Sequence, residues 1–234
     1  MNESHSENSE NDVLAKLENV ILDLGVDHIP TFGGKYEGGI HLQQVADEIA
    51  PCIYDLLNVN KKFYNFLEIG SAAGGNTYLF NHFFNFENIT IIDDNRHKKH
   101  ALRQEILKDI PHSEFIGDSH SKQAVDFLEN LQCNYDIIFI DGDHTYGGVL
   151  SDYIMCKHFL NYKGFVIFHD TYFCNGVKEY VDTMKRGAAM FRDESIEKLP
   201  VKLFGEYISK GEQKLGITVF QIYTIPKWRE NNGM

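Results

Sequence analysis

The sequence has little positive charge, no closely spaced cysteines and no long hydrophobic run. Its 234 residues include 22 Lys and Arg against 34 Asp and Glu, giving a formal net charge of -12. Such a chain repels the phosphate backbone of nucleic acid and an anionic membrane surface, so we expect neither as a partner. The four cysteines contain no C-x-x-C spacing, which argues against a zinc site of that kind and against a disulfide framework.

The N-terminus lacks the features of a signal peptide. Residues 1–12, MNESHSENSEND, are polar and acidic, whereas a signal peptide has a basic start and an apolar core. No stretch approaches the roughly 18 apolar residues of a membrane span. We therefore expect a cytoplasmic protein whose residues 1–12 form a disordered tail. Residues 13–60 are expected to hold two helices, over about 13–24 and 42–57, and a Gly-rich lid segment between them.

From residue 61 onward, short apolar runs alternate with segments of helix length. The runs cover residues 63–69, 89–92, 114–116, 135–140 and 165–168, and the helical segments cover 76–84, 96–109, 120–131, 146–160 and 176–185. This alternation predicts an α/β fold with a parallel sheet between two layers of helices. VKLFGEY and GITVFQIY near the C-terminus predict a closing antiparallel pair. The expected fold is thus a single-domain, Rossmann-like, seven-stranded, mostly parallel sheet over residues 61–228.

Polar residues follow each of the five apolar runs. An open parallel sheet binds ligands beyond the carboxyl ends of its strands, so these positions predict a binding site. An aspartate at one such position is often only a helix N-cap, but five polar strand ends together favour a ligand. The residues are Glu68 with the loop 70–75, then Asp93 and Asp94, Asp118 and Ser119, Asp141 to His144, and finally His169 and Asp170.

The sequence of the Gly-rich loop after the first run indicates which kind of nucleotide ligand it could bind. It reads G-S-A-A-G-G, with alanine where the dinucleotide fingerprint G-x-G-x-x-G has its second glycine. The sequence has no G-x-x-x-x-G-K-[ST] motif for a nucleoside triphosphate. Asp93 follows at the distance expected of a ribose-binding acid. A cofactor with a ribose but without a pyrophosphate fits these residues best.

Three of these segments resemble the motifs of class I S-adenosylmethionine-dependent methyltransferases. FLEIGSAAGGNT resembles the first motif, ITIIDDN the second, whose acid holds the cofactor ribose, and FIGDS the third, whose Asp and neighbour contact adenine. IIFIDGDHTYGGVLSDY and the later GFVIFHDTYFCNGV are similar to small-molecule O-methyltransferases of the cephalosporin hydroxylase and rhamnosyl O-methyltransferase type. The cofactor-binding residues that the resemblance implies are Glu68, Gly70, Ser71, Ala72, Gly74, Asn76, Asp93, Asp118, Ser119 and Asp141.

The resemblance implies S-adenosylmethionine-dependent methylation of a hydroxyl on a small molecule, such as a sugar, a sugar conjugate or a secondary metabolite. Two alternatives stay open: a non-catalytic module that binds S-adenosylmethionine or a protein, and a methyltransferase with another type of acceptor. A homo-oligomer also stays open. Tyr36 and Gln43 are expected in the lid over the cofactor.

The acceptor hydroxyl must lose a proton, which requires a base or a metal ion. The metal-free hypothesis assigns catalysis to His144 or His169 as general base, with Asp141 as the orienting partner. The metal hypothesis places Mg²⁺ or another divalent cation between Asp141 and Asp170, because the two strands that precede them are neighbours. His169 is a further ligand in that hypothesis and favours a softer metal than Mg²⁺.

One basic cluster is interpreted as unrelated to the site. Arg96, Lys98, Lys99 and Arg103 recur within the segment 96–109, and this spacing predicts the solvated face of a helix.

Overall fold

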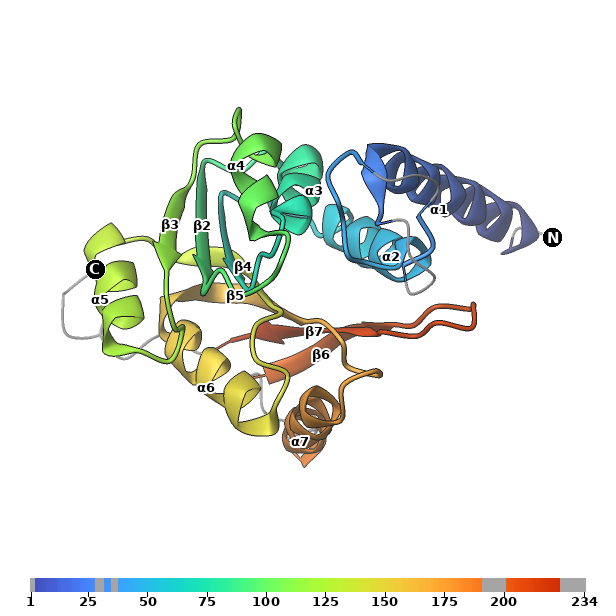
Figure 1. Cartoon of the computed structure of the whole chain (residues 1–234). Helices are drawn as coiled ribbons and strands as arrows, with labels where there is room; N and C mark the ends of the chain where they lie inside the picture. The colour runs from blue at the N-terminus through green and yellow to red at the C-terminus, as the bar shows by residue number, and fades with distance from the viewer. Residues whose placement is uncertain (1–2, 28–31, 35–37, 191–200, 224–234) are drawn as a thin grey trace.

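The computed structural model describes residues 3–27, 32–34, 38–190 and 201–223. Its centre is a seven-stranded sheet in the order β3-β2-β1-β4-β5-β7-β6, which confirms the predicted fold class (Figure 1). Five neighbouring strands are parallel, and β7 lies antiparallel between β5 and β6. The strands are β1 (Asn65–Ile69), β2 (Asn88–Asp93), β3 (Ser113–Ile116), β4 (Tyr135–Ile140), β5 (Leu160–Phe168), β6 (Val201–Tyr207) and β7 (Ile217–Ile222).

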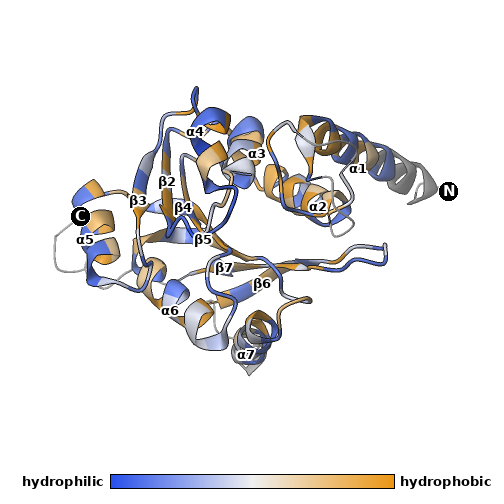
Figure 2. Cartoon of the chain, in the orientation of Figure 1, coloured by the Kyte–Doolittle hydropathy of each residue, from blue (hydrophilic) through white to orange (hydrophobic). Residues whose placement is uncertain are grey.

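Helices cover both faces of the sheet, because the central strands are apolar on both sides. Along β4, Ile137 and Phe139 face one hydrophobic core, and Ile138 and Ile140 face the other. The central strands are accordingly largely orange in Figure 2. The first core packs α1 (Glu3–Gly25), α2 (Ala46–Leu57) and α3 (Gly75–Phe84), and the second packs α5 (Lys122–Leu131), α6 (Tyr146–Cys156) and α7 (Asn175–Met190). Each helix of the described part is too short or too polar to cross a bilayer.

The N-terminal segments differ in two places from the expectation. Residues 3–12, which we expected in a disordered tail, continue helix α1 up to Glu3. Once the apolar stripe of residues 14–24 holds a helix on the core, each further turn adds hydrogen bonds without a new nucleation cost. Helix α2 begins at Ala46 rather than at residue 42. Leu42 instead pairs with Val26 in an isolated parallel bridge, which closes the Gly-rich segment between them.

The predicted helix over residues 96–109 is wrong. The structure has a 3-10 turn, His100–Leu102, followed by the four-residue helix α4 (Arg103–Ile106). The polar side chains before it bind the backbone locally: Asp94 Oδ1 accepts from the Arg96 amide, and Asp93 Oδ1 accepts from the Asn95 amide. Such local bonds compete with helical ones. Residues 94–99 therefore form an irregular turn between β2 and the short helices that follow.

Candidate active site

A cavity of about 860 Å³ lies at the carboxyl ends of the parallel strands. The residues that line it come from all five strand ends that the sequence singled out. Strand order reverses between β1 and β4, which is the switch point where ligands of open sheets bind. The predicted residues that line the cavity are Gln43, Glu68, Gly70, Ser71, Ala72, Ala73, Gly75, Asn76, Asp93, Asp94, Asp118, Ser119, Asp141, Gly142, Asp143, His144, His169 and Asp170.

The loop between β1 and α3 depends on glycine at two positions. Gly70 has a φ of +80°, and a Cβ there would lie 2.2 Å from the carbonyl oxygen of Asp141. The loop can approach the end of β4 this closely only because Gly70 has no side chain. Gly74, the predicted loop residue outside the cavity lining, is the N-cap of α3 with a φ of 85°. The two glycines turn the backbone so that Gly75 and Asn76, at the start of α3, line the cavity.

Glu68 is a buried acid at the end of β1, with only 1% of its surface exposed. Its carboxylate accepts hydrogen bonds from the Ser71 hydroxyl at 2.7 Å, from Asn76 Nδ2 at 2.8 Å and from the Thr77 hydroxyl. Burial raises the pKa of Glu68 to about 7, even though these three bonds favour the ionised form. A positively charged ligand group beside Glu68 would favour its ionisation.

The raised pKa of Glu68 makes stability depend on pH. A carboxyl that holds its proton more tightly when folded contributes stability fully below its usual pKa of 4.5, and loses that contribution as pH rises through about 7. We expect the unfolding free energy of the wild type, relative to Glu68→Gln, to fall by about 1–3 kcal/mol between these limits. Urea denaturation at a series of pH values measures the difference. Parallel curves for the two proteins would contradict the assignment.

Asp93, at the end of β2, also holds the Gly-rich loop, through the backbone amides of that loop. Its Oδ2 accepts from the backbone amides of Ser71 at 2.8 Å and Ala72 at 3.0 Å. Burial alone would raise the pKa of Asp93, but the Arg103 guanidinium and these amides outweigh it and lower the pKa. Asp93 is thus an ionised acid beside the loop, whereas its neighbour Asp94 pairs with the exposed Arg96.

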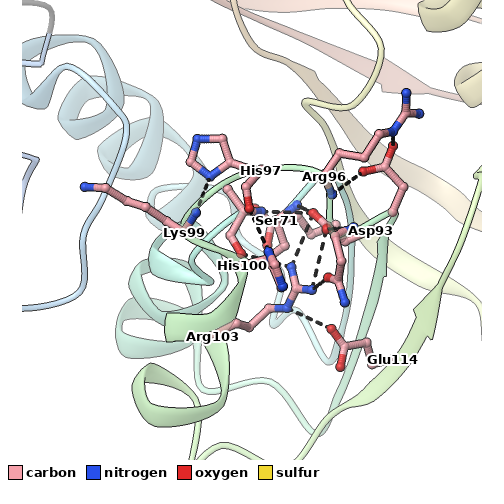
Figure 3. A network of polar contacts seen from close by, with 12 residues as sticks. Ser71, Asp93, Arg96, His97, Lys99, His100, Arg103 and Glu114 are labelled. Carbon is pink, nitrogen blue, oxygen red and sulfur yellow. Dashed lines mark hydrogen bonds and ion pairs between the residues drawn. The ribbon is translucent and has the colours of Figure 1, made fainter.

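Arg103 is the centre of the polar network in Figure 3. It is 3% exposed and lies between Asp93, whose Oδ2 is 3.3 Å from its Nη1, and Glu114 of β3, whose Oε1 is 2.7 Å from its Nε. Its Nη1 also donates to the Ala72 carbonyl at 3.0 Å. The expectation that Arg103 belongs to a solvated face is therefore wrong. The helix that would have exposed it does not form, and a buried arginine needs the two anionic partners that β2 and β3 supply.

Lys99 also departs from the predicted solvated face. Its ammonium lies 2.6 Å from Asp27 Oδ1, and the side chain is 20% exposed. Asp27 also accepts from Gln43 Nε2 at 2.9 Å and lies 3.1 Å from His41 Nδ1. His41 and Gln43 line the cavity. Asp27 thus fastens part of the predicted lid segment to the turn after β2, while the other predicted lid residue, Tyr36, lies outside the described residues.

The ends of β4 and β5 bring two aspartates and two histidines together. Asp141 Oδ1 lies 3.1 Å from both His144 Nε2 and His169 Nδ1, and Asp170 lies 3.6 Å from each of the same nitrogens. The Asp141 amide donates to Ile69 and the His169 amide donates to Ile140, so the strand pairing continues to the cluster. The side chains that follow these two adjacent parallel strands therefore meet at one point, as predicted from the sequence.

The charges in this cluster act on one another. Burial alone would raise the pKa of Asp141, but His169 and His144 outweigh it and lower the pKa. Burial alone would lower the pKa of His169, and Asp141 with Asp170 raises it instead. Asp170 responds differently: its burial is the dominant effect and raises its pKa. One ligand atom from each of Asp141, His169 and Asp170 lies within 4.8 Å of the others, a spacing that can hold a metal ion.

Asp152 of α6 is a buried acid that was not predicted from the sequence. It is 0% exposed, and its Oδ1 accepts from the Ser119 hydroxyl at 2.7 Å and lies 3.1 Å from His120 Nε2. It therefore anchors the loop after β3 through Ser119 and His120. The only signal in the sequence is an aspartate within an otherwise apolar helix, which by itself does not reveal a partner 33 residues away.

The matches with known proteins agree with this arrangement. Residues 67–171 match a family model described as a methyltransferase domain. The fold is similar to that of the O-methyltransferase TomG from Streptomyces achromogenes, solved with S-adenosylmethionine, with a TM-score of 0.56 and 13% identity over 91% of this chain and 90% of that one. This is the class I methyltransferase fold. The fold that the resemblance implied is thereby confirmed.

Two further proteins are similar to this chain, one in structure and one in sequence. The MycE methyltransferase of the mycinamycin biosynthetic pathway, solved with Mg, S-adenosylhomocysteine and mycinamycin VI, has a TM-score of 0.54 and 14% identity, over 90% of this chain and 53% of that one. An uncharacterized protein of Acanthamoeba polyphaga mimivirus is 27% identical over 113 residues, or 45% of this chain. The match spans 50% of that curated relative.

Proposed function

We propose that the protein is an S-adenosylmethionine-dependent O-methyltransferase that acts on a hydroxyl of a small molecule. One observation carries the proposal: a single cavity joins the Gly-rich loop with its two flanking acids to the Asp-His cluster at the ends of β4 and β5. The first part suits a cofactor with a ribose, and the second suits proton removal from an acceptor. A module that only bound the cofactor would not need the second part.

The cavity has the chemistry that S-adenosylmethionine requires. The cofactor would supply an electrophilic methyl group on a sulfonium. Gln44 Oε1 and Asn76 Oδ1 are buried, belong to cavity-lining residues and have no hydrogen-bond partner among the described residues, so with Glu68 they suit an ammonium group. We assign the ribose to Asp93 and the adenine to Asp118 and Ser119. Binding at these groups would align the methyl with the acceptor oxygen, and such positioning supplies roughly 7–11 kcal/mol.

For proton removal we favour a divalent cation held by Asp141, Asp170 and His169. The residues fit, because Asp170 Oδ1 is buried without a hydrogen-bond partner in the described part of the chain. The cation would lower the pKa of the acceptor hydroxyl. In the metal-free alternative, His144 or His169 accepts the proton, and Asp141 orients the ring at 3.1 Å. The solved complex of MycE contains Mg, which supports the metal form. We further propose a cytoplasmic, biosynthetic role.

Asp93 should contribute more to cofactor affinity than its neighbour. Each hydrogen bond from a hydroxyl to a carboxylate contributes about 1.5–3 kcal/mol, so Asp93→Ala should weaken S-adenosylmethionine binding roughly tenfold to several hundredfold. Asp94→Ala is the matched control and should change it much less, because Asp94 is paired with exposed Arg96. Calorimetric titration measures both dissociation constants. The reverse order would assign the ribose to Asp94.

The reaction itself is tested by S-adenosylhomocysteine release. Purified protein, with and without Mg²⁺ or Mn²⁺, is incubated with S-adenosylmethionine and hydroxylated acceptors: sugars, sugar conjugates and secondary metabolites. We expect release that depends on one acceptor class and stops after exhaustive chelation. Cofactor binding without release for any acceptor would favour the non-catalytic module. Full activity after chelation, with a large loss in His144→Ala or His169→Ala, would favour the metal-free base.

A further inference from the structure

Cys174 lies beside the Asp-His cluster, although no role for it was predicted from the sequence. Its Sγ lies 3.6 Å from Asp170 Oδ2, and the same oxygen lies 3.6 Å from His144 Nε2. The three ligand atoms of His144, Asp170 and Cys174 all lie within 4.8 Å of one another. A nitrogen, an oxygen and a sulfur donor therefore meet at Asp170 Oδ2.

The backbone holds these donors in place. The Cys174 amide donates to the Asp170 carbonyl at 3.0 Å, a single turn that sets the thiol above the carboxylate. Zinc-type metals bind oxygen and nitrogen at about 2.0–2.2 Å and sulfur at about 2.3 Å. In a tetrahedral shell those lengths separate neighbouring ligands by about 3.3–3.6 Å. The distances of 3.6 Å around Asp170 Oδ2 are close to these edges.

A second observation comes from Asp170 itself. The residue is 8% exposed, and its other oxygen, Oδ1, has no hydrogen-bond partner among the described residues. Oδ1 faces His169 Nδ1 at 3.6 Å, whereas Oδ2 faces His144 and Cys174. The two oxygens thus point to two neighbouring groups of donors. A carboxylate in this position can bridge two cations.

We propose that His144, Asp170 and Cys174 form a second divalent-cation position, which shares Asp170 with the position formed by Asp141, His169 and Asp170. A thiolate and an imidazole select borderline metals such as Zn²⁺ or Co²⁺ over Mg²⁺. Binding releases the Cys174 thiol proton to solvent as the sulfur–metal bond forms. The inference goes beyond the proposed function, because metal binding here can be measured without methyl transfer.

Cobalt titration of the full-length, metal-free protein tests the position. A thiolate bound to Co²⁺ gives a charge-transfer absorption in the near ultraviolet that nitrogen and oxygen ligands do not give. We expect this band to appear and saturate in the wild type, to vanish in Cys174→Ser and to persist in Cys133→Ser. Cys133 is the matched control, since it is a half-buried free thiol that lies outside the cavity lining and contacts the Asn134 carbonyl at 3.7 Å. No band in the wild type, or a band retained in Cys174→Ser, would overturn the proposal.

A second variant tests the cation position independently, in case Cys174→Ser does not fold. The His144 side chain is 41% exposed, so His144→Ala removes a ligand with little effect on the core. We expect its cobalt half-saturation to rise at least about tenfold, the scale on which losing a metal-site residue acts. An unchanged value would count against the position.

Calorimetric titration of S-adenosylmethionine on the same samples separates the two proposals. Cofactor binding without the cobalt band refutes only the second cation position, and the band without cofactor binding refutes only the proposed function.

Discussion

Asp141→Asn should reduce kcat about 10²–10⁴-fold, the range over which positioned proton-transfer groups act. Asp141 Oδ1 lies 3.1 Å from both His144 and His169, so one carboxylate orients both rings. It is also one of the proposed cation ligands. Asparagine keeps the shape but removes the charge that raises the pKa of His169. The loss should therefore appear mainly in kcat and in its pH profile, and only secondarily in cofactor affinity.

Asp143→Asn is the matched control for that measurement. Asp143 lies in the same loop, is exposed and accepts from the Thr145 amide at 2.8 Å. It should keep kcat within a few-fold of the wild type. Steady-state kinetics across a pH series compares the two variants. If Asp141→Asn retained the kcat and pH profile of the wild type, neither the orienting role of Asp141 nor its role as a cation ligand would stand.

Glu48→Ala should lower the free energy of unfolding by about 2–4 kcal/mol. Glu48 of α2 is 0% exposed and accepts from the backbone amides of Ser209, Leu215 and Gly216 at 2.9–3.1 Å. Each buried donor left without its acceptor costs about 1–3 kcal/mol, and partial entry of water reduces the sum. The bonds join α2 to the segment before β7, and the amides of Thr171 and Tyr172 donate to that segment beside Asp170.

Chemical denaturation of Glu48→Ala and Glu105→Ala measures the effect. The Glu105 side chain is 77% exposed and pairs only with Lys108 in the described structure, so its removal should cost less than about 1 kcal/mol. Equal stability of the two variants would mean that the amides near β7 are satisfied without Glu48.

The fold was predictable because its signals are local. The run Ile137 to Ile140 has no polar alternation, and in the structure β4 is buried along its whole length at the centre of the sheet. The antiparallel pair at the C-terminus followed from two short apolar segments around a polar turn. The helix expected over 96–109 failed because Asp93 and Asp94 bind nearby amides, an effect that hydrophobic spacing does not contain.

The candidate site was predictable to the same extent. Sheet topology brings the ends of parallel strands together, so the polar residues that follow them had to meet. The supporting residues were not predictable, because their partners are distant in the sequence. Glu48 binds amides 161 to 168 residues away, and Asp152 binds Ser119, 33 residues before it. Arg103 was predicted on a solvated helix face, but its buried ion pairs with Asp93 and Glu114 show that it is not exposed.

The expected selectivity of the cavity is for S-adenosylmethionine over a dinucleotide. It depends on Ala72 at the position of the second fingerprint glycine and on the acids Glu68 and Asp93 that flank the loop. Calorimetric titration of the wild type with S-adenosylmethionine and with NAD tests it most directly. We predict saturable heat with one S-adenosylmethionine per chain and no heat with NAD. Tight binding of NAD, with no heat from S-adenosylmethionine, would contradict the account.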